Sequence, residues 1–269
     1  MSEATSLQSA GRPATIDSVV AGLRALGVTD GSLLLVHSSL SSLGWVSGGA
    51  VAVVEALQRA VGSRGTLVMP THSTQLSEPS HWENPPVPES WWPIIRESMP
   101  PYDPGTTPTR GMGAIPEYFR TLPDSVRGEH PQWSFTAAGP VAGEIVGPHA
   151  PDSCLGDDSP LGRIYAEGGS VLLLGVDHDR NTSLHLAEQR AFAESSATRR
   201  NGAPMTIGGS RCWAEFEEFD FPDTDFCEIG NQLRTTTGIV KSGQVACAGA
   251  ELMSQPALVD FAVKWLGEH

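Results

Sequence analysis

The spacing of hydrophobic residues predicts alternating helices and strands at the start of the chain. An amphipathic helix ending near Gly27 is indicated by apolar residues at helical spacing: Ile16, Val19, Val20, Leu23 and Leu26. The continuous apolar run at 32–36 is typical of a strand buried on both faces. Residues 50–61 predict a second helix, and residues 65–70 predict a second buried strand that ends at a proline. This order predicts two parallel strands joined by a right-handed crossover.

Residues 71–110 interrupt this pattern with a long segment rich in proline. The segment holds three of the seven tryptophans, Trp82, Trp91 and Trp92, and only residues 89–99 have the spacing of a short helix. Connections of this length are usually functional. We therefore expect the segment to form a lid or a wall of a binding site.

The later part of the chain predicts a change in architecture. Short helices are expected at 113–120, 141–146 and 161–166, then a strand at 170–176 and a helix at 183–195. From Gly202 onward apolar and polar residues alternate, which predicts antiparallel strands at 205–207 and 212–219. The series ends with a helix at 228–233, a hairpin region at 238–248 and a helix at 258–266.

The predicted fold class is therefore α/β, with a parallel-strand core and helices. Toward the C-terminus it becomes α+β, with a later antiparallel strand region. We expect residues 1–13 to be a disordered leader and residues 14–269 to form a single domain.

The amino-acid composition limits which classes of protein are possible. Hydrophobic residues make up 39% of the chain, which is enough for a substantial core. No run approaches the ~18 apolar residues of a membrane helix, and the polar start lacks the hydrophobic segment of a signal peptide. We therefore expect a cytoplasmic protein with no membrane partner. Its cysteines lack Cys-x-x-Cys spacing and are expected to be reduced thiols: Cys154, Cys212, Cys227 and Cys247.

The net charge of −14 disfavours a nucleic-acid partner, which would require basic patches. Residues 144–228 hold 16 of the 31 acidic residues. A cleft in this region would attract a cationic ligand. The alternative is that these acids only keep the protein soluble.

Two segments of small residues follow predicted strands or loops and precede helices. Residues 37–40 (His-Ser-Ser-Leu) stand at the end of a strand, and residues 44–49 lead from them into a helix. Residues 107–113 have the same character and include Arg110, which could pair with a phosphate. Backbone amides in such turns bind anions. Neither segment is a Walker A or dinucleotide-binding sequence, and the alternative is a pair of plain turns with helix caps.

A helix that carries a histidine follows the strand predicted at 170–176. With Thr182 as the N-cap, His185 lies in the first turn. There the helix dipole favours neutral imidazole by ~0.3–1 kcal/mol, and neutral imidazole is the form that acts as a base. Glu188 lies three residues later on the same helix face and could hold the ring. The alternative is a packed histidine beside a surface glutamate.

Two acids on the later strand compete with Glu188 for that role. Alternation puts Glu218 and Asp220 on one face of the strand, where they could orient the ring of His185 or bind a cation. The alternative is a solvated face of the sheet.

A metal site would have to use the acids and histidines that follow the same strand: Asp177, His178, Asp179 and His185. Their spacing matches no established ligand motif, so we expect no metal, and a metal-dependent hydrolase is a minor alternative.

Five segments, kept in order, resemble the aminoglycoside 3-N-acetyltransferase family: residues 35–40, 44–50, 65–71, 127–131 and 181–188. The resemblance runs from about residue 15 to the C-terminus. It implies a distinct α/β acetyltransferase fold. It also implies direct transfer of the acetyl group of acetyl-CoA to the 3-amino group of the 2-deoxystreptamine ring of aminoglycosides, in a ternary complex, giving antibiotic resistance.

The resemblance also implies roles for individual residues. His185 would be the general base, supported by an acid on the later strand, Glu218 or Asp220, with Glu188 as the competing partner. Acetyl-CoA would be held by the residues His37, Ser38, Ser39, Leu40, Trp45, Val46, Ser47, Gly48, Thr71, Thr109, Arg110, Gly111, Met112 and Gly113. The cationic acceptor would be bound by His72, Asp157, Asp177 and Asn181. A monomer or a homodimer is expected.

The proline- and tryptophan-rich stretch 76–104 departs from the best-known resistance enzymes of this family, in which it is shorter. This leaves the acceptor open, and an N-acyltransferase that acts on an amino sugar or an amino phosphonate is the main alternative. A non-catalytic CoA-binding module is a further one.

Overall fold

A computed structural model of the chain describes residues 12–193 and 197–269. Most of the predicted leader, residues 1–11, lies outside these ranges. So do the last two residues of the helix predicted at 183–195.

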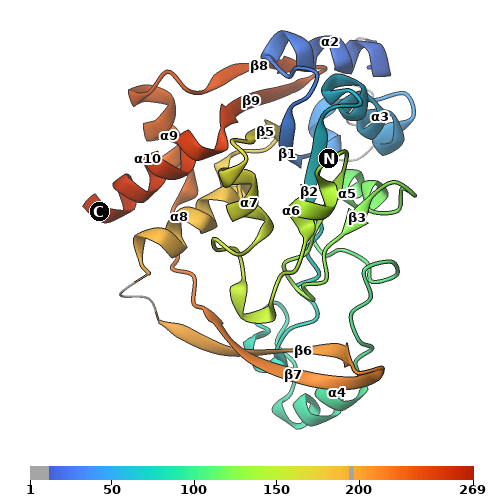
Figure 1. Ribbon diagram of the computed structural model, residues 1–269, viewed down its shortest axis with the longest axis vertical. Coiled ribbons are helices and arrows are strands. Elements are labelled where there is room, and N and C mark those ends of the chain that lie inside the picture. The colour runs from blue at the N-terminus through green and yellow to red at the C-terminus, as the bar shows by residue number, and fades with distance from the viewer. Residues whose placement is uncertain (1–11, 194–196) are drawn as a thin grey trace.

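A seven-stranded mixed sheet forms the centre of the molecule, in the order β3-β4-β2-β1-β5-β9-β8 (Figure 1). Its three central strands are parallel: β2 (Thr66–Pro70), β1 (Leu33–Ser38) and β5 (Ser170–Leu174). The outer strands pair antiparallel with their neighbours: β3 (Val126–Arg127), β4 (Phe135–Ala138), β9 (Ala248–Ser254) and β8 (Lys241–Val245). The predicted α/β class and the parallel pairing of β1 with β2 are confirmed. Strands β3 and β4 were not predicted.

Helices cover both faces of this sheet, which explains why its central strands are continuously apolar. One face packs against α2 (Ile16–Leu26), α3 (Gly49–Val61) and α5 (Ala114–Phe119). The other packs against α6 (Ala142–Val146), α7 (Pro160–Ala166), α8 (Ser183–Ala191), α9 (Phe226–Thr236) and α10 (Gln255–Glu268). Within β1, Leu34 and Val36 enter the first layer and Leu35 enters the second.

A separate antiparallel hairpin lies at the lower end of the molecule in Figure 1 and consists of β6 (Thr198–Ile207) and β7 (Ser210–Phe219). The predicted antiparallel region is confirmed, and β6 begins earlier than predicted. A lone two-stranded sheet is marginally stable. Here the proline-rich segment 71–110 supports it, with η2 (Pro79–His81), η3 (Glu89–Trp91) and α4 (Trp92–Ser98). The N–H of Tyr102 donates to the carbonyl of Pro204, and the N–H of Glu78 donates to Asn201 Oδ1.

Local capping residues set the ends of several helices. Thr15 caps α2 in a reciprocal capping box, and Gly27 ends the same helix with φ of 114°. Helix α8 ends at Ala191, earlier than predicted, with Phe192 as its C-cap residue. Single turns complete the described chain: η1 (Leu40–Leu43), η4 (Pro151–Ser153) and η5 (His178–Arg180). None of the helices in the described ranges is both long enough and apolar enough to cross a bilayer.

Gly230 in α9 offers a test of this packing. A Cβ at this position would lie 2.3 Å from Cδ2 of the buried His178 ring. Alanine normally stabilises a helix interior over glycine by up to about 1 kcal/mol. Overpacking costs about 1–3 kcal/mol, so we expect Gly230→Ala to lower the free energy of unfolding in urea titrations. Gly267 in α10 has open space around it, and Gly267→Ala should not destabilise. An equal effect of both substitutions would contradict this packing.

Candidate active site

The carboxyl ends of the three parallel strands meet at one edge of the sheet, where ligands bind in α/β folds. Strands β1 and β5 are in register, with Ser38 opposite Leu174. The N–H of Ser39 donates to the carbonyl of Leu174 at 2.9 Å, and Ser42 Oγ donates to the carbonyl of Gly175 at 2.9 Å. These bonds join the loop after β1 to the loop after β5.

A cavity of about 550 Å³ opens at this edge. Its walls come from the loops after β1 and β5 and from the segment that leads into α5. Seven residues that sequence reasoning assigned to acetyl-CoA line it: His37, Ser38, Ser39, Leu40, Gly111, Met112 and Gly113. Segments more than 70 residues apart in the sequence thus form one cavity.

The other residues assigned to acetyl-CoA do not line this cavity. Trp45, Val46, Ser47 and Gly48 precede α3, where Val46 is buried and pairs with Ala14. Thr71 is fully buried, with its hydroxyl 3.0 Å from Thr136 Oγ1.

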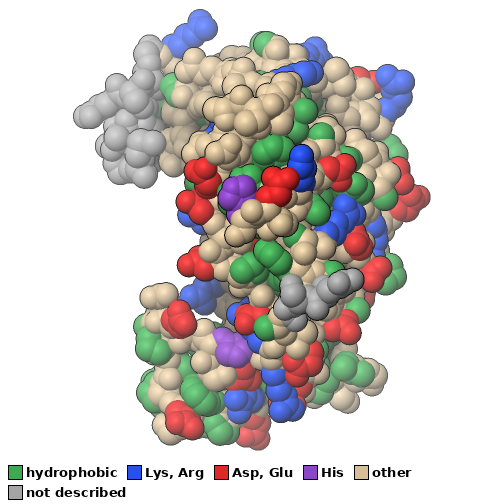
Figure 2. Space-filling view, turned by 90° about the vertical axis from the view of Figure 1, so that its left-hand side faces the viewer, with side chains coloured by type: hydrophobic (Ala, Val, Ile, Leu, Met, Phe, Trp, Pro, Cys, Tyr) green, Lys and Arg blue, Asp and Glu red, His purple; other side chains and the backbone are tan. Residues whose placement is uncertain are grey.

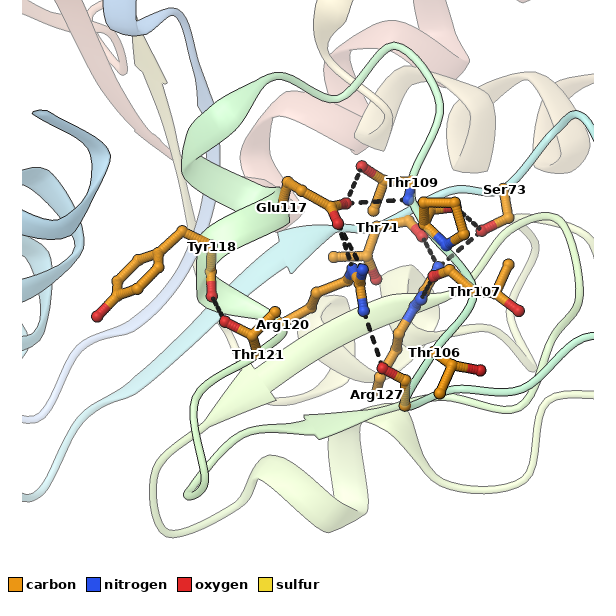
Figure 3. Close-up of polar contacts among 12 residues, drawn as sticks. Thr71, Ser73, Thr106, Thr107, Thr109, Glu117, Tyr118, Arg120, Thr121 and Arg127 are labelled. Carbon is orange, nitrogen blue, oxygen red and sulfur yellow. Dashed lines mark hydrogen bonds and ion pairs between the residues drawn. The ribbon is translucent and has the colours of Figure 1, made fainter.

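Thr109 and Arg110 precede the cavity residues 111–113 and anchor this segment by hydrogen bonds, and Figure 3 shows those of Thr109. The N–H and the hydroxyl of Thr109 both donate to Glu117 Oε2, at 2.9 and 2.6 Å, and the N–H of Arg110 donates to the carbonyl of His72. Burial raises the pKa of Glu117, but hydrogen bonds from Arg120 and Thr109 outweigh burial and hold that pKa at about 2. Glu117 therefore stays ionised and fixes this segment.

Arg127 at the end of β3 holds the loop after β2 (Figure 3). Its guanidinium is buried and donates to the carbonyls of Thr71 at 2.6 Å and Thr107 at 2.5 Å, and to Ser73 Oγ at 2.7 Å. It also donates to Ser134 Oγ and lies 5.3 Å from the ring centroid of Tyr102. No carboxylate in the described chain pairs with it, so the charge is stabilised by neutral acceptors and by that ring.

His185 is paired with Glu188 within α8. His185 Nδ1 lies 2.7 Å from Glu188 Oε2, and the Glu188 side chain is completely buried. The hydrogen bond to Glu188 engages Nδ1, so Nε2 is the ring nitrogen that lies outside the pair. The histidine side chain is 29% exposed, and no described residue hydrogen-bonds Nε2.

Thr182 connects this pair to the cavity. It occupies the N-cap position of α8, as expected, but its hydroxyl does not cap the helix. Asn181 Oδ1 instead accepts the N–H of Ser183. Thr182 Oγ1 lies 3.4 Å from His37 Nε2 and faces the cavity, one helical turn before His185.

Glu218 and Asp220 contact other groups. Glu218 is buried and accepts from Arg199 Nε at 2.8 Å and Asn201 Nδ2 at 2.7 Å. Asp220 is partly exposed, 3.7 Å from Arg199 Nη1. Among the described residues, Glu188 is the acid that hydrogen-bonds His185.

The residues assigned to the acceptor are dispersed. Asp157 is exposed and pairs with Arg190, and Asp177 pairs with Arg234. Asn181 is buried and caps α8. His72 is buried against Trp133 and Phe135, with ring centroids 5.2 Å apart in each case.

Four buried histidines are neutral at physiological pH. Burial, with smaller effects of neighbouring histidines, lowers the pKa of His37 to about 3 and that of His72 to about 3. Burial likewise lowers the pKa of His149 to about 4 and holds the pKa of His130 well below its ordinary value. His37 at the cavity wall is therefore a neutral hydrogen-bonding group.

Sequence reasoning missed the aromatic residues around His185. The ring of His185 lies 4.5 Å from Phe221 and 4.9 Å from Phe226, centroid to centroid. Phe221 follows two other phenylalanines, at 216 and 219. This cluster is the feature of the sequence that could have indicated an aromatic contact with His185. The cavity residues Asp179 and Arg180, which form an ion pair, were likewise not assigned to the cofactor.

Comparisons with known proteins agree with this fold and identify a family. A family model described as aminoglycoside 3-N-acetyltransferase matches residues 35–267. The prophage-derived aminoglycoside N(3')-acetyltransferase-like protein YokD of Bacillus subtilis is 47% identical over 94% of this chain and 92% of its own. The crystal structure of YokD has a TM-score of 0.96 at 44% identity and covers 99% of this chain and 98% of that chain.

Two ligand-bound structures are also similar. AAC-IIIb in a binary complex with CoASH has a TM-score of 0.85 at 30% identity, covering 96% of this chain and 97% of that chain. AAC-VIa bound to sisomicin has a TM-score of 0.83 at 31% identity, covering 96% and 98%. The fold and these matches define an acetyltransferase of the α/β class. More specifically, the chain belongs to the aminoglycoside 3-N-acetyltransferase family.

The buried histidines predict that the folded state loses stability in acid at pH values higher than those at which carboxylates titrate. In the unfolded chain these histidines bind protons below pH ~6.5, whereas in the folded chain His37, His72 and His149 do not until pH 4 or lower. Protons therefore favour the unfolded state, and stability falls as pH decreases from about 6.5. Each such histidine adds a slope of up to about 1.4 kcal/mol per pH unit.

Urea unfolding between pH 6.5 and 5 measures this slope. We expect His149→Gln to reduce the slope, because one buried histidine is lost, and the exposed His81→Gln to leave it unchanged. Equal slopes in wild type and His149→Gln would refute this origin of acid sensitivity.

Replacement of Arg127 tests its structural role. Arg127→Met would leave the buried carbonyls of Thr71 and Thr107 without this donor, and each lost partner costs about 1–3 kcal/mol. We therefore expect the free energy of unfolding to fall by about 2–4 kcal/mol. Arg64 pairs with Asp30 at the surface, and Arg64→Met should change little. Denaturant titration of both variants distinguishes the loss of the buried hydrogen bonds of Arg127 from the general effect of removing one positive charge.

Proposed function

We propose that this protein transfers the acetyl group of acetyl-CoA directly to the 3-amino group of the 2-deoxystreptamine ring of aminoglycosides, and so confers antibiotic resistance. The observation that carries the proposal is the His185–Glu188 pair beside the cavity at the strand ends. The similarity to AAC-IIIb with CoASH and to AAC-VIa with sisomicin supports the two substrates. Residues 14–269 would then act as a single cytoplasmic acetyltransferase domain.

The cavity residues fit a CoA thioester. Ser38 Oγ is buried and has no partner within the described chain, so a polar ligand atom would satisfy it. Gly111, Gly113 and Gly175 have positive φ and present backbone without side chains at the cavity wall. We assign the thioester arm of acetyl-CoA to this cavity, where its pantetheine chain would meet Ser38 and Ser39.

His185 would remove the proton that the acceptor amine must lose. As the amine nitrogen bonds to the acetyl carbon, the bond from that carbon to the CoA sulfur breaks. The amine proton moves to His185 Nε2 and can then pass to the departing sulfur. Glu188 holds Nδ1–H, which fixes the tautomer and stabilises the imidazolium that forms.

The state of the buried thiol of Cys154 disfavours a covalent acetyl intermediate on this cysteine. Cys154 is buried, and burial together with the carboxylate of Glu218 raises the pKa of its thiol. A thiol in this state is a poor nucleophile because the thiolate is the reactive form. The buried thiol therefore supports the proposal of direct transfer in a ternary complex.

His185→Ala should lower kcat by roughly 10²–10⁴, the usual contribution of a general base. Glu188→Gln should lower kcat with little effect on the KM for acetyl-CoA, because it disturbs the tautomer and leaves the cavity intact. The assay is thiol release from acetyl-CoA with kanamycin, gentamicin and apramycin.

His81→Ala, at an exposed position, is the control and should retain wild-type turnover. Full activity in His185→Ala would overturn the assignment of the base. Transfer to an amino sugar or an amino phosphonate, with none to the three antibiotics, would overturn the acceptor.

A further inference from the structure

A buried polar cluster around Glu218 lies between the hairpin and the site and has no role in the chemistry described so far. Besides Arg199 and Asn201, the carboxylate of Glu218 is met by Trp133 Nε1 at 3.4 Å and Cys154 Sγ at 3.4 Å. A buried carboxylate is costly unless several donors satisfy it. These donors come from β6, from the loop before β4 and from the end of η4, so Glu218 joins three separate segments.

The indole of Trp133 leads from this cluster to His185. Its ring lies 5.2 Å from the ring of His72 and 6.3 Å from that of Phe221. Phe221 lies edge-on to the ring of His185 at 4.5 Å. We call Trp133 and Phe221 the aromatic wall.

The aromatic wall contacts the ring of His185 through Phe221 and lies outside the cavity assigned to acetyl-CoA. Neither Trp133 nor Phe221 lines that cavity, which meets α8 at Thr182, one turn before His185. A base in a ternary complex has the thioester on one side and the acceptor on the other. In Figure 2 the outline of the molecule is notched between the upper body and the lower part, which carries β6 and β7 in Figure 1.

We propose that Trp133 and Phe221 form the apolar side of the acceptor site, and that Glu218 is a positioning residue that acts on the acceptor by holding the indole of Trp133. The inference rests on the proposed acetyl transfer. The ligand class is a polyamine-bearing ring whose C–H face packs on the aromatic wall while its amine reaches His185 Nε2. Asp220, partly exposed at the end of the same strand, adds negative charge for such a cation.

Two substitutions test the coupling. Trp133→Phe keeps a ring and removes the N–H donor, and Glu218→Gln keeps the shape and removes the charge. We expect each to raise the KM for the acceptor about tenfold, with the KM for acetyl-CoA unchanged. The double variant should be no worse than either single variant, because both break the same contact. The pH profile of kcat should stay in place, whereas Glu188→Gln should alter it.

The control is Glu215→Gln, on the same strand, which loses an exposed pair with Arg200 and should retain wild-type kinetics. Calorimetry of acceptor binding in the presence of CoA provides a readout independent of turnover. The inference is overturned if the effects of Trp133→Phe and Glu218→Gln on the acceptor KM multiply in the double variant. It is also overturned if Glu218→Gln leaves the KM and the Kd for the acceptor unchanged. A shift of the pH profile by Glu218→Gln would show that Glu218 acts on His185 itself. If the wild-type enzyme acetylates none of the amines tested, the proposed function itself is wrong.

Discussion

The outer half of the site depends on the hydrogen bonds of a buried arginine that pairs with no carboxylate among residues 12–193 and 197–269. Arg127 directs its guanidinium at the carbonyls of Thr71 and Thr107, so it ties the end of β2 to the proline-rich segment. That segment in turn reaches β6 through the hydrogen bond from the N–H of Tyr102 to the carbonyl of Pro204. Because the guanidinium donates to backbone carbonyls, its hydrogen bonds fix the position of the main chain and not only that of side chains. The hairpin is therefore held at a defined distance from the large sheet.

The parts of the fold that could be predicted are those whose signal is local. Residues 32–36 and 65–70 are apolar without alternation because helices cover both faces of the central strands, and that pattern is visible in the sequence. Strands β3 and β4 were missed because they are short and lie in irregular sequence, so only pairing with β2 makes them strands. The first residues of β6 are polar and basic, so their sequence does not predict a strand. They become extended because they pair with β7.

The same division applies to the site. His185 and Glu188 are three residues apart on one helix, so helical geometry alone brings them together, and their contact follows from the sequence. The family resemblance assigned residues 37–40 and 111–113 to the same ligand, and both segments line one cavity in the structure. The approach of Phe221 to His185, and of Trp133 to Glu218, joins positions far apart in the chain. No local pattern encodes such contacts. Alternation placed Glu218 and Asp220 on one face of β7, but in the structure both acids contact Arg199 and not His185.

The two proposals together divide the site into a part that would perform the chemistry and a part that would select the acceptor. The base and the thioester cavity lie on the parallel strands and on α8, which a continuous core holds rigid. The aromatic wall rests on the hairpin, which contributes little to that core and is held by polar contacts such as Arg199 with Glu218. Changes in the hairpin can therefore alter which amine reaches His185 while the pairing of His185 with Glu188 stays intact. A family built in this way can keep one reaction and vary its acceptors, because the energetic cost of variation falls outside the core.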